Sequence, residues 1–119
     1  RDLIVTGVQT CALPIWENRR IIGEARYMIE PGEGFADTAF MVDENYQGRG
    51  IASFLLNYLV EIAKERGLQG FKADVLFSNQ PMLKVYDKLP FKIHKKFADG
   101  VISLKFRFDE FKEDTETKK

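Results

Sequence analysis

Apolar and polar residues alternate along two neighbouring segments, which predicts β-strands over residues 20–29 and 35–43. On the first segment, one face carries Ile21, Gly23, Ala25, Tyr27 and Ile29, and the other carries Glu24 and Arg26. On the second, one face carries Phe35, Asp37, Ala39, Met41 and Asp43, and the other carries Ala36, Thr38, Phe40 and Val42. Turn-forming residues at 30–34 separate the segments, so we expect an antiparallel hairpin.

Two later segments have the period of helices. From about residue 50 to 66, apolar residues recur on one helical face, and Gly67 suits the position just after a helix. Asn79 can cap a shorter helix that reaches about Leu89 and is ended by Pro90. Both segments are amphipathic, so each is expected to pack one face on the rest of the domain.

Alternation returns over residues 70–77, 91–97 and 101–108, and a turn at 98–100 joins the last two strands. The order is strand, strand, helix, strand, helix, strand, strand. A strand–helix–strand step requires the third strand to run parallel to the second, whereas the hairpins give antiparallel neighbours. The pattern therefore predicts an α+β fold with a mixed sheet.

Composition indicates a single globular domain. The 119 residues are 45% hydrophobic, and 18 Lys and Arg balance 18 Asp and Glu. A formal charge of zero gives no electrostatic reason to expect a nucleic-acid or membrane partner. No apolar run approaches the roughly 20 residues of a spanning helix, and one cysteine cannot form an internal disulfide. We expect a cytoplasmic protein.

The first fifteen residues differ in character from the rest. Residues 5–15 resemble an in-frame translation of a sequencing-library adapter, and they lack a clear helix or strand period. The alternative is a genuine N-terminal strand, since Leu3, Ile4 and Val5 have high β propensity. We assign no function to residues 1–15, so Cys11 is not a candidate nucleophile, and we place the start of the native chain near residue 16.

The segment 47–52 (Gln-Gly-Arg-Gly-Ile-Ala) lies where the second strand gives way to the long helix. Glycines let the backbone approach a ligand closely, and a helix N-terminus attracts anions. The third glycine of a dinucleotide-binding fingerprint is replaced by Ser53, and the Gly-Lys-Ser/Thr of a phosphate-binding loop is absent. A tight turn alone would explain two glycines, so the neighbouring motifs decide between these interpretations.

A second motif, Asn79-x-x-Met82-x-x-x-Tyr86-x-x-Leu89-Pro90-Phe91, follows at a suitable distance from Gln47-x-x-Gly50-x-Ala52. Together the two motifs resemble the GNAT superfamily of N-acetyltransferases over about residues 20–108. The resemblance implies a mostly antiparallel sheet with one central parallel pair splayed apart and two helices packed on it. It also implies that a strand and two helices shaping the acceptor pocket are missing, so 16–109 is a partial domain followed by a charged, flexible tail at 110–119.

The resemblance assigns roles to particular residues. Acetyl-CoA would be the acyl donor, with no metal. The residues that would bind it are Met41, Val42, Gln47, Gly48, Arg49, Gly50, Ile51, Ala52, Ser53 and Asn79. Met41 and Val42 would pair through their main chain with the pantetheine arm. Tyr86 would direct its hydroxyl at the cofactor sulfur, and Asp37 matches the strand position of a general base acting through a water.

Each role has a structural alternative. Tyr86 could be a core tyrosine, Arg49 a solvated loop arginine, and Asp37 a surface carboxylate paired with Arg26. Glu24 is a second candidate base, although a surface role suits it better. The only histidine, His94, has no neighbouring ligand types and is not expected to take part in the chemistry.

The resulting hypothesis is direct transfer of acetyl from acetyl-CoA to a primary amine in a ternary complex. The acceptor would be a small molecule or a protein lysine. The alternative is a non-catalytic acyl-CoA-binding regulatory module fused to a larger acyl-CoA-handling polypeptide. A position of both Asp37 and Tyr86 in the cleft near the sulfur would favour catalysis, whereas an outward-facing Asp37 would favour the regulatory module.

Overall fold

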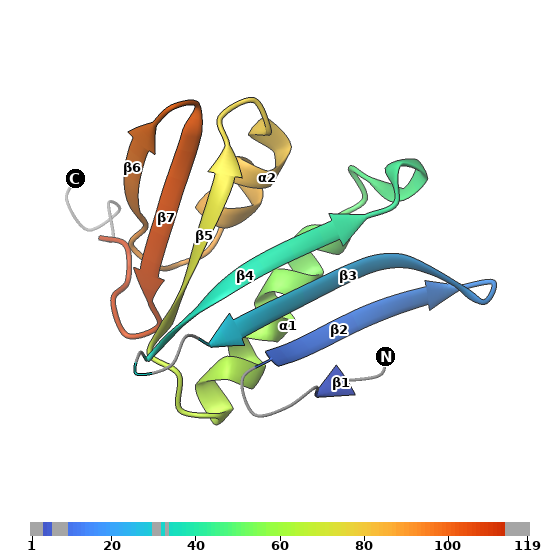
Figure 1. Cartoon of the computed structure of the whole chain (residues 1–119), viewed down its shortest axis with the longest axis horizontal. Coiled ribbons are helices and arrows are strands. Elements are labelled where there is room, and N and C mark those ends of the chain that lie inside the picture. Colours follow the sequence, from blue (N-terminus) through green and yellow to red (C-terminus); the bar gives the residue numbers. More distant parts are fainter. Residues whose placement is uncertain (1–3, 6–9, 30–31, 33, 114–119) are drawn as a thin grey trace.

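The computed structural model describes residues 4–5, 10–29, 32 and 34–113. It forms one mixed sheet with the strand order β1-β2-β3-β4-β5-β7-β6 and two α-helices (Figure 1). The elements are β1 (Ile4–Val5), β2 (Thr10–Glu17), β3 (Arg20–Ile29), β4 (Phe35–Val42), the 3-10 helix η1 (Glu44–Tyr46), α1 (Ile51–Glu65), β5 (Gly70–Leu76), α2 (Gln80–Asp87), β6 (His94–Ala98) and β7 (Val101–Arg107). The predicted α+β class and the order of elements from β3 onward are confirmed.

The parallel strands β4 and β5 pair only at their beginnings. The ladder joins Phe35 to Gly70, Ala36 to Phe71 and Asp37 to Lys72, although each strand continues for several more residues. Beyond the last pair the two strands diverge from a shared origin, as Figure 1 shows. We call the end of this short ladder, at Asp37 and Lys72, the vertex. The splayed central pair that the family resemblance implied is therefore present.

Both helices cover the same face of the sheet (Figure 1). The face of α1 turned to the sheet buries Leu55, Leu59 and Ala63 completely, as the helical spacing of its apolar residues requires. An aromatic cluster fills the space beside α2, and its members are Phe71, Tyr86, Phe91, Phe106 and Phe108. The opposite face of β5, β7 and β6 is not covered by either helix, and we call it the open face.

Two strand predictions needed adjustment. The strand predicted over 91–97 begins at His94, because Phe91 is 4% exposed and stacks on Phe106 in the core. Ile21 was expected to share a face with Ala25 and Tyr27, which are buried, but it is 39% exposed, while Ile22 is buried. The register between β2 and β3 shifts at Ile15 and Trp16, and such a bulge breaks strict alternation.

Part of the adapter-like segment lies in the sheet. β2 pairs antiparallel with β3 along its whole length, and Cys11 and Leu13 are buried in the core. Burial raises the pKa of the Cys11 thiol, which keeps it protonated at neutral pH. The suggested origin of residues 1–15 stays a prediction, and most of residues 1–9 lie outside the described part of the chain. The predicted flexible tail also lies mostly outside it, from residue 114 onward.

Candidate functional site

A groove with a volume of about 530 Å³ lies on the helix-covered side of β4, and we call it the helix-side groove. Its lining residues are Phe40, Met41, Val42, Tyr46, Gln47, Gly48, Gly50, Ile51, Ala52, Ser53, Asn79, Pro81, Met82, Lys84, Val85 and Lys88. Every residue that the motifs assigned to the cofactor is in this set except Arg49. The end of β4, the loop before α1 and the beginning of α2 are thus brought together around one cavity.

The loop before α1 has the backbone geometry of an anion site. Gly48 and Gly50 adopt left-handed conformations, with φ of 79° and 84°, which side chains other than glycine rarely adopt. Gly50 is the N-cap of α1 and has no side chain to bind the first N–H groups of the helix. The first turn also carries no acidic residue. The N–H groups of residues 51–53, at the positive end of the helix, are therefore suited to an anion.

Gln47 has a structural role that the sequence did not reveal. Its side-chain amide donates to the carbonyl oxygen of Val42 at 3.0 Å, which ties the loop to the end of β4. The Asp43 carboxylate accepts from the Asn45 N–H at 2.9 Å and caps η1. These bonds hold the path of the chain between β4 and α1 and so position the glycines that follow.

The main chain of β4 offers different residues to its two neighbours. The Asp43 N–H donates to the Ile22 carbonyl of β3. Because hydrogen-bonding direction alternates along an antiparallel pair, the main-chain groups of Met41 point to β3, and those of Phe40 and Val42 point away from it. Phe40, which the motif analysis did not select, is therefore better placed than Met41 to pair with an extended ligand in the groove.

Cationic side chains at the groove also differ from those predicted. Arg49 does not line the cavity, and its guanidinium lies 5.2 Å from the centre of the Tyr46 ring, in a cation–π arrangement. Lys84 and Lys88 do line it. They are four residues apart on α2 and its C-cap, so they share one helical face, a spacing that could have identified them in the sequence.

Asn79 caps α2, as the sequence predicted. Its Oδ1 accepts from the Met82 N–H at 3.3 Å, and the residue also lines the helix-side groove. The cap uses only the side-chain oxygen of Asn79, so the helix does not need the side-chain NH2 group. The structural role in the helix and contact with a ligand are therefore compatible.

Tyr86 lies one layer beneath the groove. It is 2% exposed, and its ring stacks on Phe40, which lines the cavity. Its hydroxyl is 2.7 Å from Thr38 Oγ1, and Thr38 Oγ1 donates to the Lys72 carbonyl at 3.3 Å. Burial raises the pKa of Tyr86 to about 12, and the Thr38 hydrogen bond opposes this shift only in part. Tyr86 is thus a neutral hydroxyl held at the vertex.

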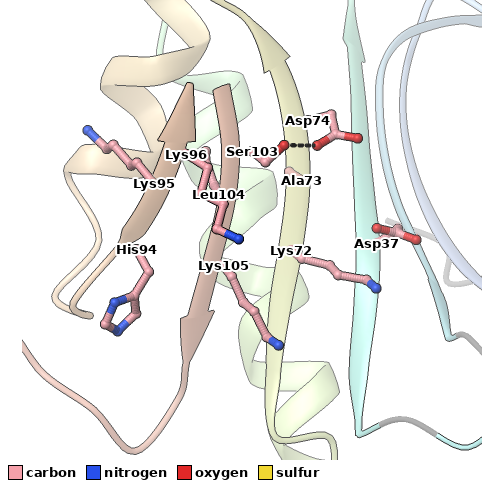
Figure 2. A pocket seen from close by; sticks show the side chains of 10 residues that line it. All are labelled: Asp37, Lys72, Ala73, Asp74, His94, Lys95, Lys96, Ser103, Leu104 and Lys105. Carbon is pink, nitrogen blue, oxygen red and sulfur yellow. Dashed lines mark hydrogen bonds between the residues drawn. The ribbon is translucent and has the colours of Figure 1, made fainter. Parts of the chain in front are cut away.

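Asp37 lies on the opposite side of the sheet from Tyr86. It precedes Thr38 on β4, and successive strand residues point to opposite faces. Its exposed side chain lines a second groove of about 540 Å³ on the open face, which we call the open-face groove (Figure 2). The structure therefore places the two candidate catalytic residues at one vertex but not in one cavity. Arg26, the alternative partner that the sequence offered for Asp37, binds the Glu24 carboxylate at 2.8 and 2.9 Å.

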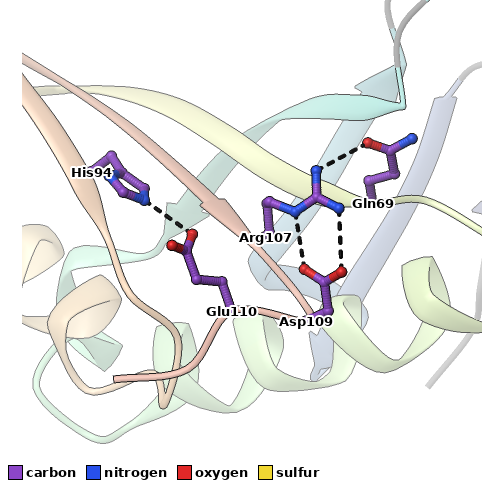
Figure 3. A network of polar contacts seen from close by, with 5 residues as sticks. All are labelled: Gln69, His94, Arg107, Asp109 and Glu110. Carbon is purple, nitrogen blue, oxygen red and sulfur yellow. Dashed lines mark hydrogen bonds and ion pairs between the residues drawn. The ribbon is translucent and has the colours of Figure 1, made fainter. Parts of the chain in front are cut away.

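The only histidine in the sequence, His94, binds a carboxylate that follows the end of β7. His94 Nε2 is 3.0 Å from Glu110 Oε1, and Arg107 contacts both Asp109 and Gln69 (Figure 3). The hydrogen bond from Arg107 lowers the pKa of Asp109.

Within the part of the chain that the structure describes, no three His, Cys, Asp or Glu side chains form a group that could hold a metal. Neither described helix is long and apolar enough to cross a bilayer.

Comparison with known proteins identifies the family. The model of the acetyltransferase (GNAT) family matches residues 5–91. Acetyltransferase Pat of Mycolicibacterium smegmatis is 43% identical over 70 residues, which are 58% of this chain and 21% of Pat. Glucosamine 6-phosphate N-acetyltransferase of Trypanosoma brucei brucei is 32% identical over 83 residues, which are 65% of this chain and 54% of that protein.

Solved structures agree with the sequence relatives. The GNAT domain of S. lividans PAT superposes with a TM-score of 0.74 at 33% identity, over 85% of this chain and 62% of that one. The cAMP-binding acyltransferase from Mycobacterium smegmatis superposes with a TM-score of 0.74 at 29% identity, over 95% of this chain and 36% of that one. The chain thus spans about a fifth of Pat and about half of the trypanosomal enzyme. On the family match and this fold, the chain belongs to the GNAT acetyltransferase family.

Proposed function

We propose that this chain is an N-acetyltransferase domain that binds acetyl-CoA in the helix-side groove and transfers acetyl directly to a primary amine. The observation that carries the proposal is the convergence of the glycine loop, the end of β4 and the start of α2 on one cavity. Family membership supports an acyl-CoA donor, and the geometry supports a binding mode for it. The acceptor and the catalytic residues are part of the proposal.

The pyrophosphate of CoA would lie on the N–H groups of residues 51–53, where the α1 dipole favours negative charge. Lys84 and Lys88 would add charge-assisted contacts to phosphate from α2. The pantetheine arm would follow β4 toward the vertex. The Gln47 side chain already donates a hydrogen bond to the Val42 carbonyl. We therefore expect the arm to pair with the main chain of Phe40 and with the Val42 N–H.

In the transfer step, the amine nitrogen attacks the thioester carbonyl carbon, the C–S bond breaks, and the thiolate leaves. Asp37 would accept the proton from the amine through a water, and the thiolate would then take up a proton from solvent. The products are an amide and free CoA, with no acyl-enzyme intermediate. Burial raises the pKa of Tyr86 to about 12, so its hydroxyl would stabilise the thiolate by a hydrogen bond and not by giving up its proton.

The orientation of the Thr38 hydroxyl would decide whether Tyr86 can donate its hydrogen bond to the thiolate. Its hydroxyl donates to the Lys72 carbonyl, so the proton shared between Thr38 and Tyr86 belongs to Tyr86 in this arrangement. For Tyr86 to donate to sulfur, Thr38 must rotate its hydroxyl and donate to Tyr86. Thr38 is therefore a positioning residue for Tyr86, and the motif analysis did not select it.

A non-catalytic acyl-CoA-binding module is the second candidate. The position of Asp37 on the opposite sheet face from Tyr86 favours it, because the two side chains do not share a cavity. In that case the helix-side groove would bind acyl-CoA, and no amine would react. The two candidates share the donor site and differ only in whether an acceptor reaches the thioester.

Calorimetric titration with acetyl-CoA and then a thiol-release assay with a panel of amines test both candidates. We expect binding, followed by thiol release with at least one class of amine. Tyr86→Phe should keep the affinity for acetyl-CoA and slow thiol release. Binding without release for every amine would support the regulatory module, and absence of binding would overturn the donor site itself.

A further inference from the structure

β6 is the last strand on one side of the sheet, and no other described strand lies along its outer side (Figure 1). Natural proteins protect such strands with proline, a bulge, a covering segment or charged side chains. β6 has no proline, its register with β7 is continuous, and all five of its residues are exposed. Only its two lysines, Lys95 and Lys96, offer protection. The main chain is therefore open to a further strand, and charge decides which strand can approach.

The turn between β6 and β7 fixes which main-chain groups point outward. Its two residues, 99–100, have φ values of 53° and 77°, as in a tight two-residue hairpin. The flanking residues Ala98 and Val101 therefore form a hydrogen-bonded pair. Because the bonding direction alternates along the strand, the N–H and C=O groups of Lys95 and Phe97 point away from β7. We call these four groups the β6 edge.

Two exposed aromatic rings lie beside the hairpin end of the β6 edge. Phe97 is 64% exposed and Phe77 is 53% exposed, and their ring centroids are 5.4 Å apart. The Phe77 N–H donates to the Gly100 carbonyl at 2.8 Å, which holds Phe77 against the hairpin. Phe97 is paired with Ile102, which packs on the core, so its ring lies on the helix-covered side of the sheet. Adjoining apolar side chains with this exposure are typical of an interaction surface.

Positive charge surrounds the β6 edge. From α2 to the end of β7, residues 80–107 carry seven Lys and Arg but only two Asp, in a chain whose formal charge is zero. Lys95 binds Asp87 of α2 at 2.9 Å, on the helix-covered side. Lys96 lies on the open face, and no ion pair joins it to another described residue. A second copy of β6 would bring lysines close to lysines, whereas an acidic strand would neutralise them.

We propose that the β6 edge binds an extended segment of a partner protein in which acidic and apolar residues alternate. The main chain of the segment pairs with the outward N–H and C=O groups of Lys95 and Phe97 as an added strand. Successive side chains of a strand point to opposite faces. One row therefore places an apolar side chain beside the Phe77 and Phe97 rings, and the other places carboxylates beside Lys96. A single-stranded nucleic acid would satisfy the lysines but not the alternating main-chain donors and acceptors, which favours the protein segment.

This inference goes beyond the proposed acetyl transfer and does not depend on it. No residue of β6 lines the helix-side groove, so a segment bound at the β6 edge leaves the donor site open. The partner and acetyl-CoA therefore have separate sites, and each can be measured in the presence of the other.

Fluorescence anisotropy with labelled, end-blocked peptides tests the proposal on the full chain. The probe has the sequence Glu-Val-Glu-Phe-Glu-Val-Glu, and its matched control has Lys in place of every Glu. We expect the Kd of the acidic peptide to be at least about tenfold lower than that of the basic peptide at low salt, with a smaller difference as salt is added. Equal binding of the two peptides, no binding of the acidic one, or tighter binding of a single-stranded oligothymidylate would overturn the inference.

Amide hydrogen exchange of the wild-type chain separates strand addition from attraction by charge alone. The acidic peptide should slow exchange at the Lys95 and Phe97 amides, which point outward in the free chain. The amides of His94 and Lys96 point toward β7, so their exchange should change little. Binding without protection of Lys95 and Phe97 would overturn the proposed mode, and so would protection of these amides by self-association of the chain without peptide.

A pair of variants at one position tests the outward main-chain donor. Lys95→Pro removes the N–H that points away from β7 and should raise the Kd of the acidic peptide at least about tenfold. Lys95→Gln also loses the ion pair with Asp87 but keeps the N–H, so it should raise the Kd less than about threefold. Equal effects of the two variants would overturn strand addition. Failure to bind acetyl-CoA would instead overturn the proposed function and leave this inference in place.

Discussion

The two grooves lie on opposite sides of the same strand and rely on different chemistry. The helix-side groove offers mainly backbone: two left-handed glycines, the N-terminus of α1 and the edge of β4. The open-face groove offers charged side chains. At the vertex, the consecutive residues Asp37 and Thr38 direct their side chains to the two different sides. Recognition by backbone depends on the path of the chain, whereas recognition by side chains can change with single substitutions that leave the fold intact.

The largest effect should come from Asp37, which tests whether the open face takes part in the reaction. Asp37→Asn keeps the shape of the side chain and removes its capacity to accept a proton, so acetyl transfer should fall about 100-fold or more. The Kd of acetyl-CoA should not change. Glu24→Gln is the matched control, because that carboxylate is bound to Arg26 within the same strand, β3. Equal rates of acetyl transfer for Asp37→Asn and the wild type would show that Asp37 is not the base.

Alkaline unfolding tests whether Tyr86 is sealed beneath the helix-side groove. Its pKa is raised from 10 to about 12, so the folded state holds the phenolic proton more tightly than the unfolded state does. The corresponding stabilisation is complete below pH 10 and is lost as the pH rises toward 12, and it amounts to roughly 3 kcal/mol. Denaturant titrations at several pH values should show a steeper alkaline loss of stability in the wild type than in Tyr86→Phe. The exposed Tyr58→Phe should behave like the wild type, and an equally steep loss in Tyr86→Phe would contradict burial of the hydroxyl.

Backbone conformation at the loop can be tested by comparing the two ends of α1. Gly50→Val places a β-branched residue at a φ of 84°, which costs about 1–2 kcal/mol and displaces the N–H groups from the anion position. We expect the Kd of acetyl-CoA to rise at least about tenfold. Gly67→Val introduces similar strain at a φ of 83° beyond the other end of the helix, so it should lower stability without changing the Kd. If both variants weaken binding equally, the loop has no special role.

The smallest effect concerns the cations at the helix-side groove. The double variant Lys84→Gln/Lys88→Gln should raise the Kd of acetyl-CoA about two- to fivefold, because exposed charges contribute little each. The salt dependence of the Kd should also become shallower. Arg49→Gln, which removes a guanidinium stacked on Tyr46 outside the cavity, should have less effect. A larger effect of Arg49→Gln would show that the loop rearranges when the cofactor binds.

Most secondary structure could be predicted because it follows from local pattern. β3 has the predicted bounds, and Asn79 caps α2 as expected. Asp99 and Gly100 adopt the positive φ values of a tight turn between β6 and β7. The start of β6 was misplaced because Phe91 leaves the ladder to pack in the core, and that depends on partners such as Phe106, which is distant in sequence.

The candidate site was predictable where one motif supplies several neighbours. Residues 47–53 line the groove together, Arg49 excepted, because a loop and a helix N-terminus bring consecutive residues to one place. The partners of Tyr86 were not predictable in this way. Thr38 is 48 residues away, and only the packing of α2 against the vertex brings the two hydroxyls together.

By itself, the sequence determined the order of the elements, the parallel relation of β4 and β5, and the glycine-rich path of the loop that leads into α1. Periodicity, glycine conformation and helix polarity are local properties and survive in any correct fold. Only the tertiary structure decided which face of β4 the helices cover. That choice buries Tyr86 against Thr38 and leaves Asp37 with the lysines of β5, β7 and β6, because alternation along a strand assigns side chains to faces and packing between elements decides which face is closed.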